Sequence, residues 1–327
     1  ATLIRSACGC PGPGADGSRL LGVTMRFSAC WRIVAALFVT VALFTSCSLR
    51  TLAVNRLGDA LAQGGDVFAA DDDPELVGDA LPFTLKLIES LLAENPRHRG
   101  LLLAAAKGFT QYSYGWVQQK GSESADPAEQ LRQNERARRL YRRARDYGLR
   151  TLAADPGFPQ ALASKPDETL RSLGRADVPA LYWTAAAWGL LISVSKDDPE
   201  TIADLPVVGA MMDRALVLDE SFGGGALHAF LISYEPNRPG AEGDPMARAR
   251  RHFDRSVELS GGRLASPFVS FAEAVSIQTQ NRAEFVAMLQ RALEVDPDAV
   301  AAWRTENHLA QRHARWLLAH QTELFLE

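Results

Sequence analysis

Apolar residues after Cys47 recur at the i, i+3 and i+4 spacing of an α-helix, and this period constrains the fold more than any other feature. One such apolar stripe runs from Leu76 to Leu92. The period-two alternation that half-buried strands require is scarce in the same part of the chain. Because helical spacing dominates, we predict an all-α fold.

The first long helix is bounded by residues that start and stop helices. Asp73 offers an N-cap side chain, and Pro74 follows at the first helical position, where proline is well tolerated. The helix is expected to end at Asn95 and Pro96. Because Pro82 inside this stretch removes an intrahelical hydrogen bond, we expect a kink or a break there.

Later helices end in a similar way, which indicates a helical repeat. Three further segments close on an aspartate that is followed by proline or glutamate: Leu152–Pro156, Ala215–Glu220 and Ala292–Pro297. The second helix of a tetratricopeptide repeat carries a small residue, a large one four positions later, a small one three after that and a turn residue five beyond. This pattern is followed by Ala249, Phe253, Ser256 and Gly261.

The spacing of these helix ends departs from a regular array. Successive ends are separated by 60, 64, 41 and 36 residues, whereas a regular tetratricopeptide array would step by about 34. We therefore predict tetratricopeptide-repeat-like helical hairpins with insertions. An antiparallel helical bundle with good caps is the alternative.

The first 46 residues are expected not to contribute to the fold. Residues 1–24 are interpreted as an upstream segment that is not translated, with Met25 as the start. Basic residues then precede Ile33–Phe44, an apolar run of 12 residues. As a helix this run spans about 18 Å, against a bilayer core of about 30 Å. Residues 25–46 are therefore predicted to be a lipoprotein signal peptide, with a membrane anchor as the alternative.

Residues Phe44–Cys47 resemble a bacterial lipobox, in which small residues precede a cysteine that becomes acylated. The consensus has leucine where this chain has Phe44. The other cysteines are Cys8, Cys10 and Cys30, and all three would be lost with the leader. Because Cys47 could then form no internal disulfide, lipidation explains why it is there. We predict that its acyl chains, such as palmitate, anchor the protein to a membrane.

These signals divide the chain and predict its location. Residues 47–70 are expected to form a lipid-anchored tether with the first helix, and residues 71–327 the tetratricopeptide-like helical domain. An anchor that follows a secretion signal predicts a lipoprotein that faces the periplasm. Ser48 after the lipidated cysteine favours the outer membrane over the inner membrane.

Charge argues against nucleic acid as a partner. Without residues 1–46 the chain carries 31 basic and 38 acidic residues, a net charge of −7. Nucleic-acid binders have a basic balance. The eight arginines within Arg132–Arg150 are therefore interpreted as a solvated helix face, or as one that docks on an acidic partner.

No motif for catalysis is present in the sequence. It contains no GxSxG, HExxH, P-loop or GxGxxG, and Gly223–Gly225 lacks the Lys-Ser/Thr of a phosphate-binding loop. His308 and His313 are five residues apart, off the spacing that places two ligands on one helical face, so we expect surface or capping roles rather than zinc. The prediction is no enzyme, no metal and no cofactor. A lytic or hydrolytic envelope enzyme is the alternative.

Two aromatic clusters, within Phe109–Trp116 and Leu181–Gly189, are candidates for a ligand-binding cavity. Glycine and alanine between large aromatics leave space that the rings can wall, although ordinary repeat core is the alternative. Buried Tyr and Trp need hydrogen-bond partners, which favours the cavity. Residues 183 and 188 are about 140° apart around a helix, so they cannot share one narrow face. The candidate cavity residues are Tyr112, Trp116, Tyr182, Trp183 and Trp188.

Several of these stretches together resemble the T component of the tripartite ATP-independent periplasmic (TRAP) transporter systems. In that family a lipoprotein of tetratricopeptide-like helices accompanies the periplasmic substrate-binding subunit. The segments that carry the resemblance are Asp71–Val77, Ala80–Lys86, Glu89–Leu92, Gly108–Tyr112, Leu181–Trp183 with Trp188, Ala249–Phe253 and Glu258–Gly261. The loop near Pro236–Gly243 is looser than in the family.

The resemblance implies properties that composition and spacing do not reveal. It implies a curved or ring-like array around a central cavity, a homotrimer, and contact with the substrate-binding protein of a TRAP system. The predicted function is thus a periplasmic accessory lipoprotein that also binds a small apolar or amphipathic ligand. The alternative is a generic tetratricopeptide scaffold lipoprotein for envelope protein assembly, which binds no small molecule.

Overall fold

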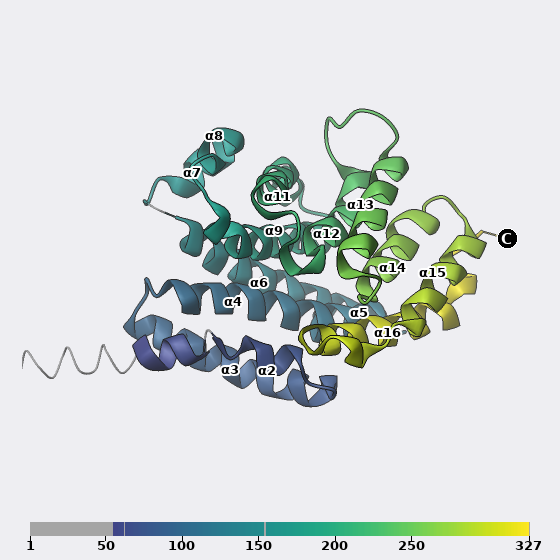
Figure 1. The fold of residues 1–327 in the computed structure, drawn as a ribbon, viewed down its shortest axis with the longest axis horizontal. Coiled ribbons are helices and arrows are strands. Elements are labelled where there is room, and N and C mark those ends of the chain that lie inside the picture. The colour runs from purple at the N-terminus through teal and green to yellow at the C-terminus, as the bar shows by residue number, and fades with distance from the viewer. Residues whose placement is uncertain (1–54, 62, 154, 327) are drawn as a thin grey trace, which may run out of the picture. The chain divides into compact units, whose positions relative to one another are not determined.

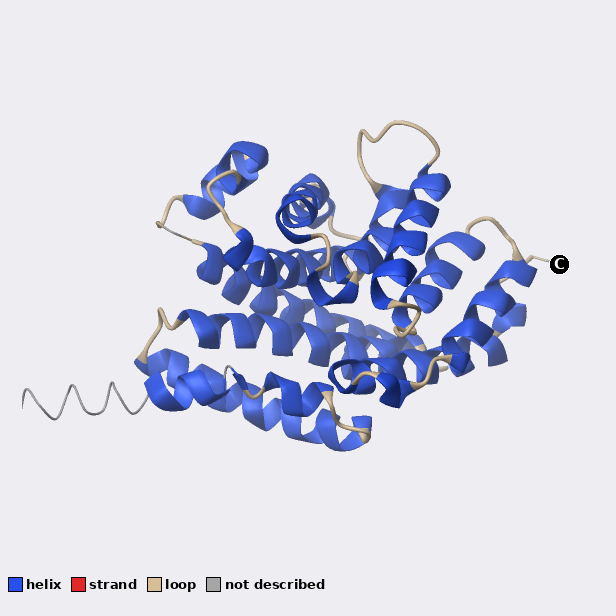
Figure 2. Ribbon diagram, viewed as in Figure 1, coloured by secondary structure: helices blue, strands red, loops and turns tan. Residues whose placement is uncertain are grey.

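The computed structural model describes residues 55–61, 63–153 and 155–326, and all regular structure in these residues is helical (Figure 2). The all-α prediction is therefore confirmed. Residues 54–327 group into one compact unit. The predicted leader and the predicted lipidation site Cys47 lie outside the described residues. Among the helices that are described, none has the length and apolar character needed to span a membrane.

Long helices follow one another along the chain with short connections (Figure 1). The long helices are α3 (Pro74–Glu94), α4 (Arg99–Tyr112), α6 (Pro127–Leu152), α9 (Val178–Ser193), α11 (Leu205–Asp219), α12 (Ala226–Tyr234), α13 (Pro245–Ser260), α15 (Arg282–Glu294) and α16 (Arg304–Ala319). The shorter α-helices are α2 (Gly65–Ala69), α5 (Gln119–Ser122), α7 (Phe158–Ser164), α8 (Pro166–Leu170), α10 (Pro199–Ile202) and α14 (Ser266–Phe271).

Two π-helical turns and several 3-10 turns connect these helices. The π-helical turns are η1 (Ser113–Gln118) and η5 (Ala272–Ser276). The 3-10 turns are η2 (Arg175–Asp177), η3 (Phe222–Gly224), η4 (Glu235–Asn237), η6 (Pro297–Ala299), η7 (Ala301–Trp303) and η8 (Gln321–Glu323).

Helices that are neighbours in sequence also pack against each other. Helix α3 packs on α4, α4 on α6, α6 on α9 and α9 on α11. In the second half α12 packs on α13, α14 on α15 and α15 on α16. Such pairing is what helical hairpins require. The tetratricopeptide register and the ring-like arrangement stay predictions.

The expected start and end of α3 are confirmed, and of the kink or break expected at Pro82 the break is wrong. The Asp73 side chain accepts a hydrogen bond from the Leu76 backbone N–H at 2.9 Å, and the helix ends before Asn95. The helix continues through Pro82. Leu81 and Leu85 on either side are buried, and burial of each leucine contributes about 1.5–3 kcal/mol. This packing outweighs the hydrogen bond that proline removes, which costs about 3 kcal/mol.

The small-large-small pattern on α13 is buried as its spacing predicts. Ala249, Phe253 and Ser256 all lie in the interior. The Phe253 ring packs against the rings of Phe268 and Phe271, at centroid distances of 5.5 and 4.7 Å. Gly261 ends the helix at φ 62°, in the left-handed region that favours glycine.

Helix α16 returns the C-terminal part of the unit to its N-terminal part (Figure 1). The Thr305 hydroxyl lies 2.6 Å from the carbonyl oxygen of Phe68 and 2.8 Å from that of Asp71. The Arg312 guanidinium donates to the carbonyl of Gly115 at 2.8 Å. These long-range contacts join α16 to α2, to the turn before α3 and to η1.

Candidate functional site

Helix α9 carries three of the candidate cavity residues, and Trp188 belongs to the packed core. It is 7% exposed and lies among the buried residues that α9, α11 and α12 share. Its indole N–H donates to Asp204 Oδ2 at 3.1 Å, and the Arg145 guanidinium lies 5.2 Å from its ring centroid. Since the ring and its polar atom both have protein partners, the core interpretation fits Trp188 best.

Tyr182 and Trp183, on another side of α9, are only partly buried. The Tyr182 ring meets the ring of Trp183 edge-on at a centroid distance of 4.9 Å, and that of Phe222 at 5.4 Å. The Lys107 ammonium, from α4, lies 5.9 Å from the centroid of the Trp183 ring. Among the described residues, neither that ammonium nor the Trp183 indole N–H has a hydrogen-bond partner.

Glu306 of α16 reaches the same region. It is exposed by surface area, yet desolvation raises its pKa, while a hydrogen bond from the Ser266 hydroxyl at 2.6 Å and the charge of Lys107 lower it in part. The charges of Lys107 and Glu306 act on each other, and Glu306 also acts on Tyr182, so α16 brings this carboxylate into the region of the Lys107 ammonium and the α9 rings.

Tyr114 and Tyr182 are also influenced by the charge of Glu306. Tyr114 is 39% exposed, and desolvation together with the charges of Glu273 and Glu306 raises its pKa. Desolvation and the charge of Glu306 also raise the pKa of Tyr182. The structure thus brings together five side chains from α4, η1, α9 and α16, which we name the cavity group: Lys107, Tyr114, Tyr182, Trp183 and Glu306.

Tyr112 and Trp116 make their contacts elsewhere. Their rings stack on each other at a centroid distance of 6.2 Å. The Trp116 indole N–H donates to the carbonyl of Pro74 on α3 at 2.9 Å, and the Tyr112 hydroxyl accepts a hydrogen bond from Arg136 on α6 at 2.9 Å. Trp116 thus joins η1 to α3, and Tyr112 joins the end of α4 to α6.

Three members of the cavity group were missed by reasoning from the sequence. Tyr114 lies inside the aromatic segment but was not singled out. Lys107 is the one cation in the interior of an otherwise apolar helix sequence, LLLAAAKGF, and this signal could have identified it. Glu306 has no comparable local signal, because it lies on a helix with many polar residues.

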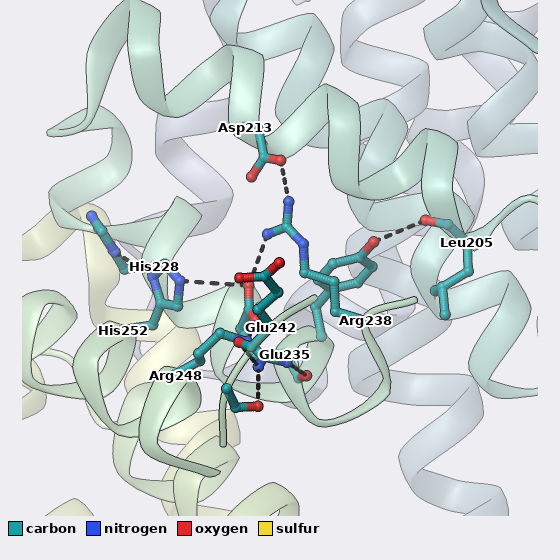
Figure 3. A network of polar contacts seen from close by, with 10 residues as sticks. Leu205, Asp213, His228, Glu235, Arg238, Glu242, Arg248 and His252 are labelled. Atoms are coloured by element: carbon teal, nitrogen blue, oxygen red, sulfur yellow. Dashed lines mark hydrogen bonds and ion pairs between the residues drawn. The ribbon is translucent and has the colours of Figure 1, made fainter. Parts of the chain in front are cut away.

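A second polar cluster joins α11, α12, η4 and α13, and we name it the Glu235 network (Figure 3). The Glu235 side chain is 2% exposed and accepts hydrogen bonds from Arg238 at 2.8 Å and from Arg248 at 2.6 Å. Arg238 also pairs with Asp213 and lies between the two carboxylates in Figure 3. Burial alone would raise the pKa of Glu235, but the hydrogen bonds from both arginines outweigh it and lower that pKa.

Two histidines complete the Glu235 network. His228 Nδ1 lies 2.8 Å from His252 Nδ1, and His228 Nε2 lies 3.1 Å from the Glu220 carboxylate. Since the carboxylate can only accept, His228 carries its proton on Nε2 and accepts at Nδ1 from the Nδ1–H of His252. Desolvation lowers the pKa of both rings, and the charge of His228 helps to bring that of His252 to about 4. Both rings are therefore neutral near pH 7.

His313 has the opposite character. We expected it at the surface or in a cap, but it is 5% exposed. Its ring nitrogens lie 2.9 Å from Glu123 and 3.1 Å from Glu273. Desolvation acts against the charge, but the two carboxylates outweigh it and raise the pKa of His313 to about 9. The imidazolium thus binds α16 to the α5–α6 turn and to η5.

The described residues contain no group of three or more His, Cys, Asp or Glu side chains arranged to hold a metal ion. In the Glu235 network each carboxylate is paired with an arginine. Each histidine nitrogen that forms a hydrogen bond has another side chain of the protein as its partner. The geometry is that of a stabilising network, whereas the cavity group contains side chains with accessible surface and a cation that has no hydrogen-bond partner among the described residues.

Comparison with known proteins supports the resemblance drawn from the sequence. Residues 70–325 match the family described as the TRAP transporter T-component. A protein of Treponema pallidum (strain Nichols), named as an uncharacterized protein, is 30% identical over 324 residues, which cover 90% of this chain and 98% of that protein. The resemblance is therefore confirmed over nearly all of the described helices.

Proposed function

The chain belongs to the TRAP transporter T-component family, and from this we propose that it is a lipid-anchored periplasmic subunit that assists a TRAP-type transport system. The match over residues 70–325 is the observation that carries this proposal. T-components are accessory proteins of transporters rather than a known family of enzymes. The proposed role is therefore binding: to the substrate-binding protein of the system and to a small ligand.

The cavity group is the proposed ligand site. Aromatic rings with accessible surface bind the apolar part of a ligand, because contact removes both surfaces from water. Trp183 and Tyr182 supply such rings, and the ammonium of Lys107 stands beside them without a hydrogen-bond partner. This combination favours an amphipathic ligand whose apolar part lies on the rings and whose polar end lies near Lys107.

Binding of cis-parinaric acid, a fluorescent amphipathic probe, tests the ligand site. The full chain in a non-ionic detergent is expected to bind the probe saturably, and Lys107→Met and Trp183→Ala to weaken binding at least fivefold. Lys120→Met is the matched control, because Lys120 is exposed and pairs with Glu129 at 3.9 Å on the outer surface. Equal affinity in all four proteins would exclude the cavity group as the site.

Co-purification from the native cells tests the partner. A TRAP substrate-binding protein enriched with the tagged full chain, and not with an unrelated tagged lipoprotein, is the expected result. If envelope-assembly proteins are enriched in its place, the scaffold function replaces the transport function. A neighbouring gene for a substrate-binding protein would also support the transport function over the scaffold function.

Membrane fractionation tests the lipid anchor. Acyl chains on Cys47 would supply the strong membrane attachment, since two chains anchor stably where one is marginal. Cys47→Ser is therefore expected to move the protein into the soluble fraction, whereas Ser48→Ala leaves it with the membranes. Continued sedimentation of Cys47→Ser with washed membranes would contradict lipidation there.

Sedimentation of the chain from Ser48 onward tests the homotrimer. The expected species has three times the monomer mass. A single monomeric species at micromolar concentration would rule out a stable trimer.

A further inference from the structure

The arginine-rich part of α6 forms a hollow on the surface that the proposed function does not use. The hollow has a volume of about 340 Å³. It is lined by Arg139, Arg142, Arg143, Asp146, Tyr147 and Arg150. These positions are separated by steps of three and one, so they share one face of the helix. Sequence reasoning identified the arginines but left their role open between solvation and docking.

The charges around the hollow are not balanced by the protein. Asp146 is the carboxylate in its lining, and it pairs with Arg145 at 2.9 Å. Glu89 of α3 faces Arg143 at 3.4 Å but also accepts hydrogen bonds from Lys86 and Tyr147. Four guanidinium groups line the hollow, and Asp146 and Glu89 supply two carboxylates, so an excess of two positive charges remains.

Two of the arginines have no counter-ion in direct contact. Within the described part of the chain, Arg139 and Arg142 form no hydrogen bond and no ion pair, although the charge of Arg142 acts on Asp198 from a distance. Both are exposed. Like charges three or four residues apart on a helix repel each other and destabilise it. An acidic chain that gathers four arginines at one place therefore gains stability from an added anion.

The other two arginines are held in position. The Arg143 guanidinium lies 5.2 Å from the centroid of the Phe109 ring, and that of Arg150 lies 5.3 Å from the centroid of the Tyr147 ring. Arg150 also donates to the carbonyl of Pro96 at 2.8 Å. Two oriented guanidiniums and two without partners can together surround one compact anion with paired N–H donors.

We propose that this hollow binds a phosphate group that carries at least two negative charges. The phosphate oxygens accept from the N–H groups of Arg139 and Arg142, and Arg143 and Arg150 add charge from the sides. A single carboxylate would neutralise one of the two excess charges, whereas a dianionic phosphate neutralises both. The site is separate from the cavity group and does not depend on a transport function.

Inorganic pyrophosphate is the first probe, used with the full chain in a non-ionic detergent. Modification of arginines by phenylglyoxal, followed by mass spectrometry, gives a rate for each residue. Pyrophosphate is expected to slow modification of Arg139 and Arg142 at least fivefold. Modification of Arg251, an exposed arginine of α13, is expected to stay unchanged.

Calorimetric titration with pyrophosphate provides the second measurement. The double variant Arg139→Ala with Arg142→Ala is expected to bind at least tenfold more weakly than the native chain. The matched control replaces two exposed arginines elsewhere, Arg251→Ala with Arg315→Ala, and is expected to bind within twofold of the native chain. Both double variants change the net charge equally, so a general charge effect would weaken them equally and would overturn the proposal.

Two further arms identify the source of the phosphate. Protection of Arg139 and Arg142 in nanodiscs of phosphatidylglycerol, but not of phosphatidylcholine, supports a lipid headgroup. Protection by pyrophosphate without protection by phosphatidylglycerol supports a soluble phosphate compound. Protection by poly-glutamate alone would overturn the proposal and indicate an acidic protein surface, and so would the absence of protection by every anion.

Discussion

The Glu235 network and the cavity group both contain charged side chains, but those charges differ in burial and in hydrogen-bond partners. In the network, Glu235 is held by two arginines and is nearly inaccessible to water. In the cavity group, Lys107 has no hydrogen bond among the described residues, and Glu306 keeps accessible surface. Removing one partner of a buried charge pair leaves the other charge uncompensated and costs stability, whereas a charge without a hydrogen-bond partner is available to a ligand. Substitutions in the first region should therefore affect stability, and those in the second should affect binding.

The largest expected effect follows from removal of the Glu235 carboxylate. Glu235→Ala leaves Arg238 and Arg248 partly buried without this counter-charge, and breaking such a buried pair costs about 3–5 kcal/mol. Urea unfolding of the purified protein measures the loss. Glu242→Ala, in the loop that follows, is the control and should change the free energy of unfolding by less than about 0.5 kcal/mol, because that side chain is exposed. Equal stability of both variants would show that the network contributes little.

Substitution of the two tryptophans of α9 compares a core position, Trp188, with a proposed ligand-binding position, Trp183, on a single helix. Trp188→Ala removes a buried ring and should cost about 3–5 kcal/mol of stability. Trp183→Ala removes a partly exposed ring and should cost about 1–2 kcal/mol, while it weakens cis-parinaric acid binding at least fivefold. Thermal melts and probe titrations of both variants measure the two effects. A large melting shift in both, with no separate binding defect, would place Trp183 in the core as well.

The dependence of stability on pH compares the two kinds of buried histidine. The pKa of His252 is about 4 in the fold and 6.5 unfolded, so the unfolded chain binds more protons between these values. Its stabilising contribution is complete above pH 6.5 and is lost as the pH falls toward 4. The pKa of His313 is raised to about 9, so its contribution is complete below pH 6.5 and is lost as the pH rises through 9.

Stability should therefore be highest near pH 6.5 and should fall on both sides. Urea midpoints measured from pH 4 to pH 9.5 test this, and each side has its own variant. His313→Gln should abolish most of the decline above pH 7, and His252→Gln most of the decline below pH 6. If each variant keeps the decline that it is expected to remove, the histidines do not control the pH dependence.

The smallest expected effect on stability is that of Lys107→Met. The ammonium has no hydrogen-bond partner in the described structure, so its removal should change the free energy of unfolding by less than about 0.5 kcal/mol. Urea unfolding beside the cis-parinaric acid titration measures both quantities on one preparation. A loss above about 1.5 kcal/mol would mean that Lys107 is part of the structural core, and the contrast with the Glu235 network would disappear.

Most of the helices could be predicted from the sequence because their signals are local. Asp73 caps α3, and Gly261 ends α13 in the conformation that glycine favours, as their neighbours in sequence indicate. Whether α3 continues through Pro82 could not be predicted in this way. A proline breaks a helix unless packing on both sides holds it, and that packing comes from residues of other helices.

The candidate site could be predicted only in part. The aromatic residues of α9 were identified, and the angle between Trp183 and Trp188 correctly separated them onto different sides of the helix. Which side is buried more deeply could not be read from that angle, because the neighbours of each side belong to other helices, such as α4, α6 and α11. Lys107 offered a local signal as a cation within an apolar helix, whereas Glu306 did not.

By itself the amino-acid sequence determined the helical period, the helix caps and the family. The period and the caps depend on residues a few positions apart. The family depends on several sequence segments and on their order along the chain. The tertiary structure alone decided which charges meet. His228 and His252 join across two helices, His313 meets Glu123 from 190 residues away, and the charge of Glu306 on α16 acts on Tyr182 of α9. The physical reason is that a contact between helices depends on the rotation of each helix about its own axis. It also depends on where α16 packs against the N-terminal helices. The periodicity within one helix specifies neither.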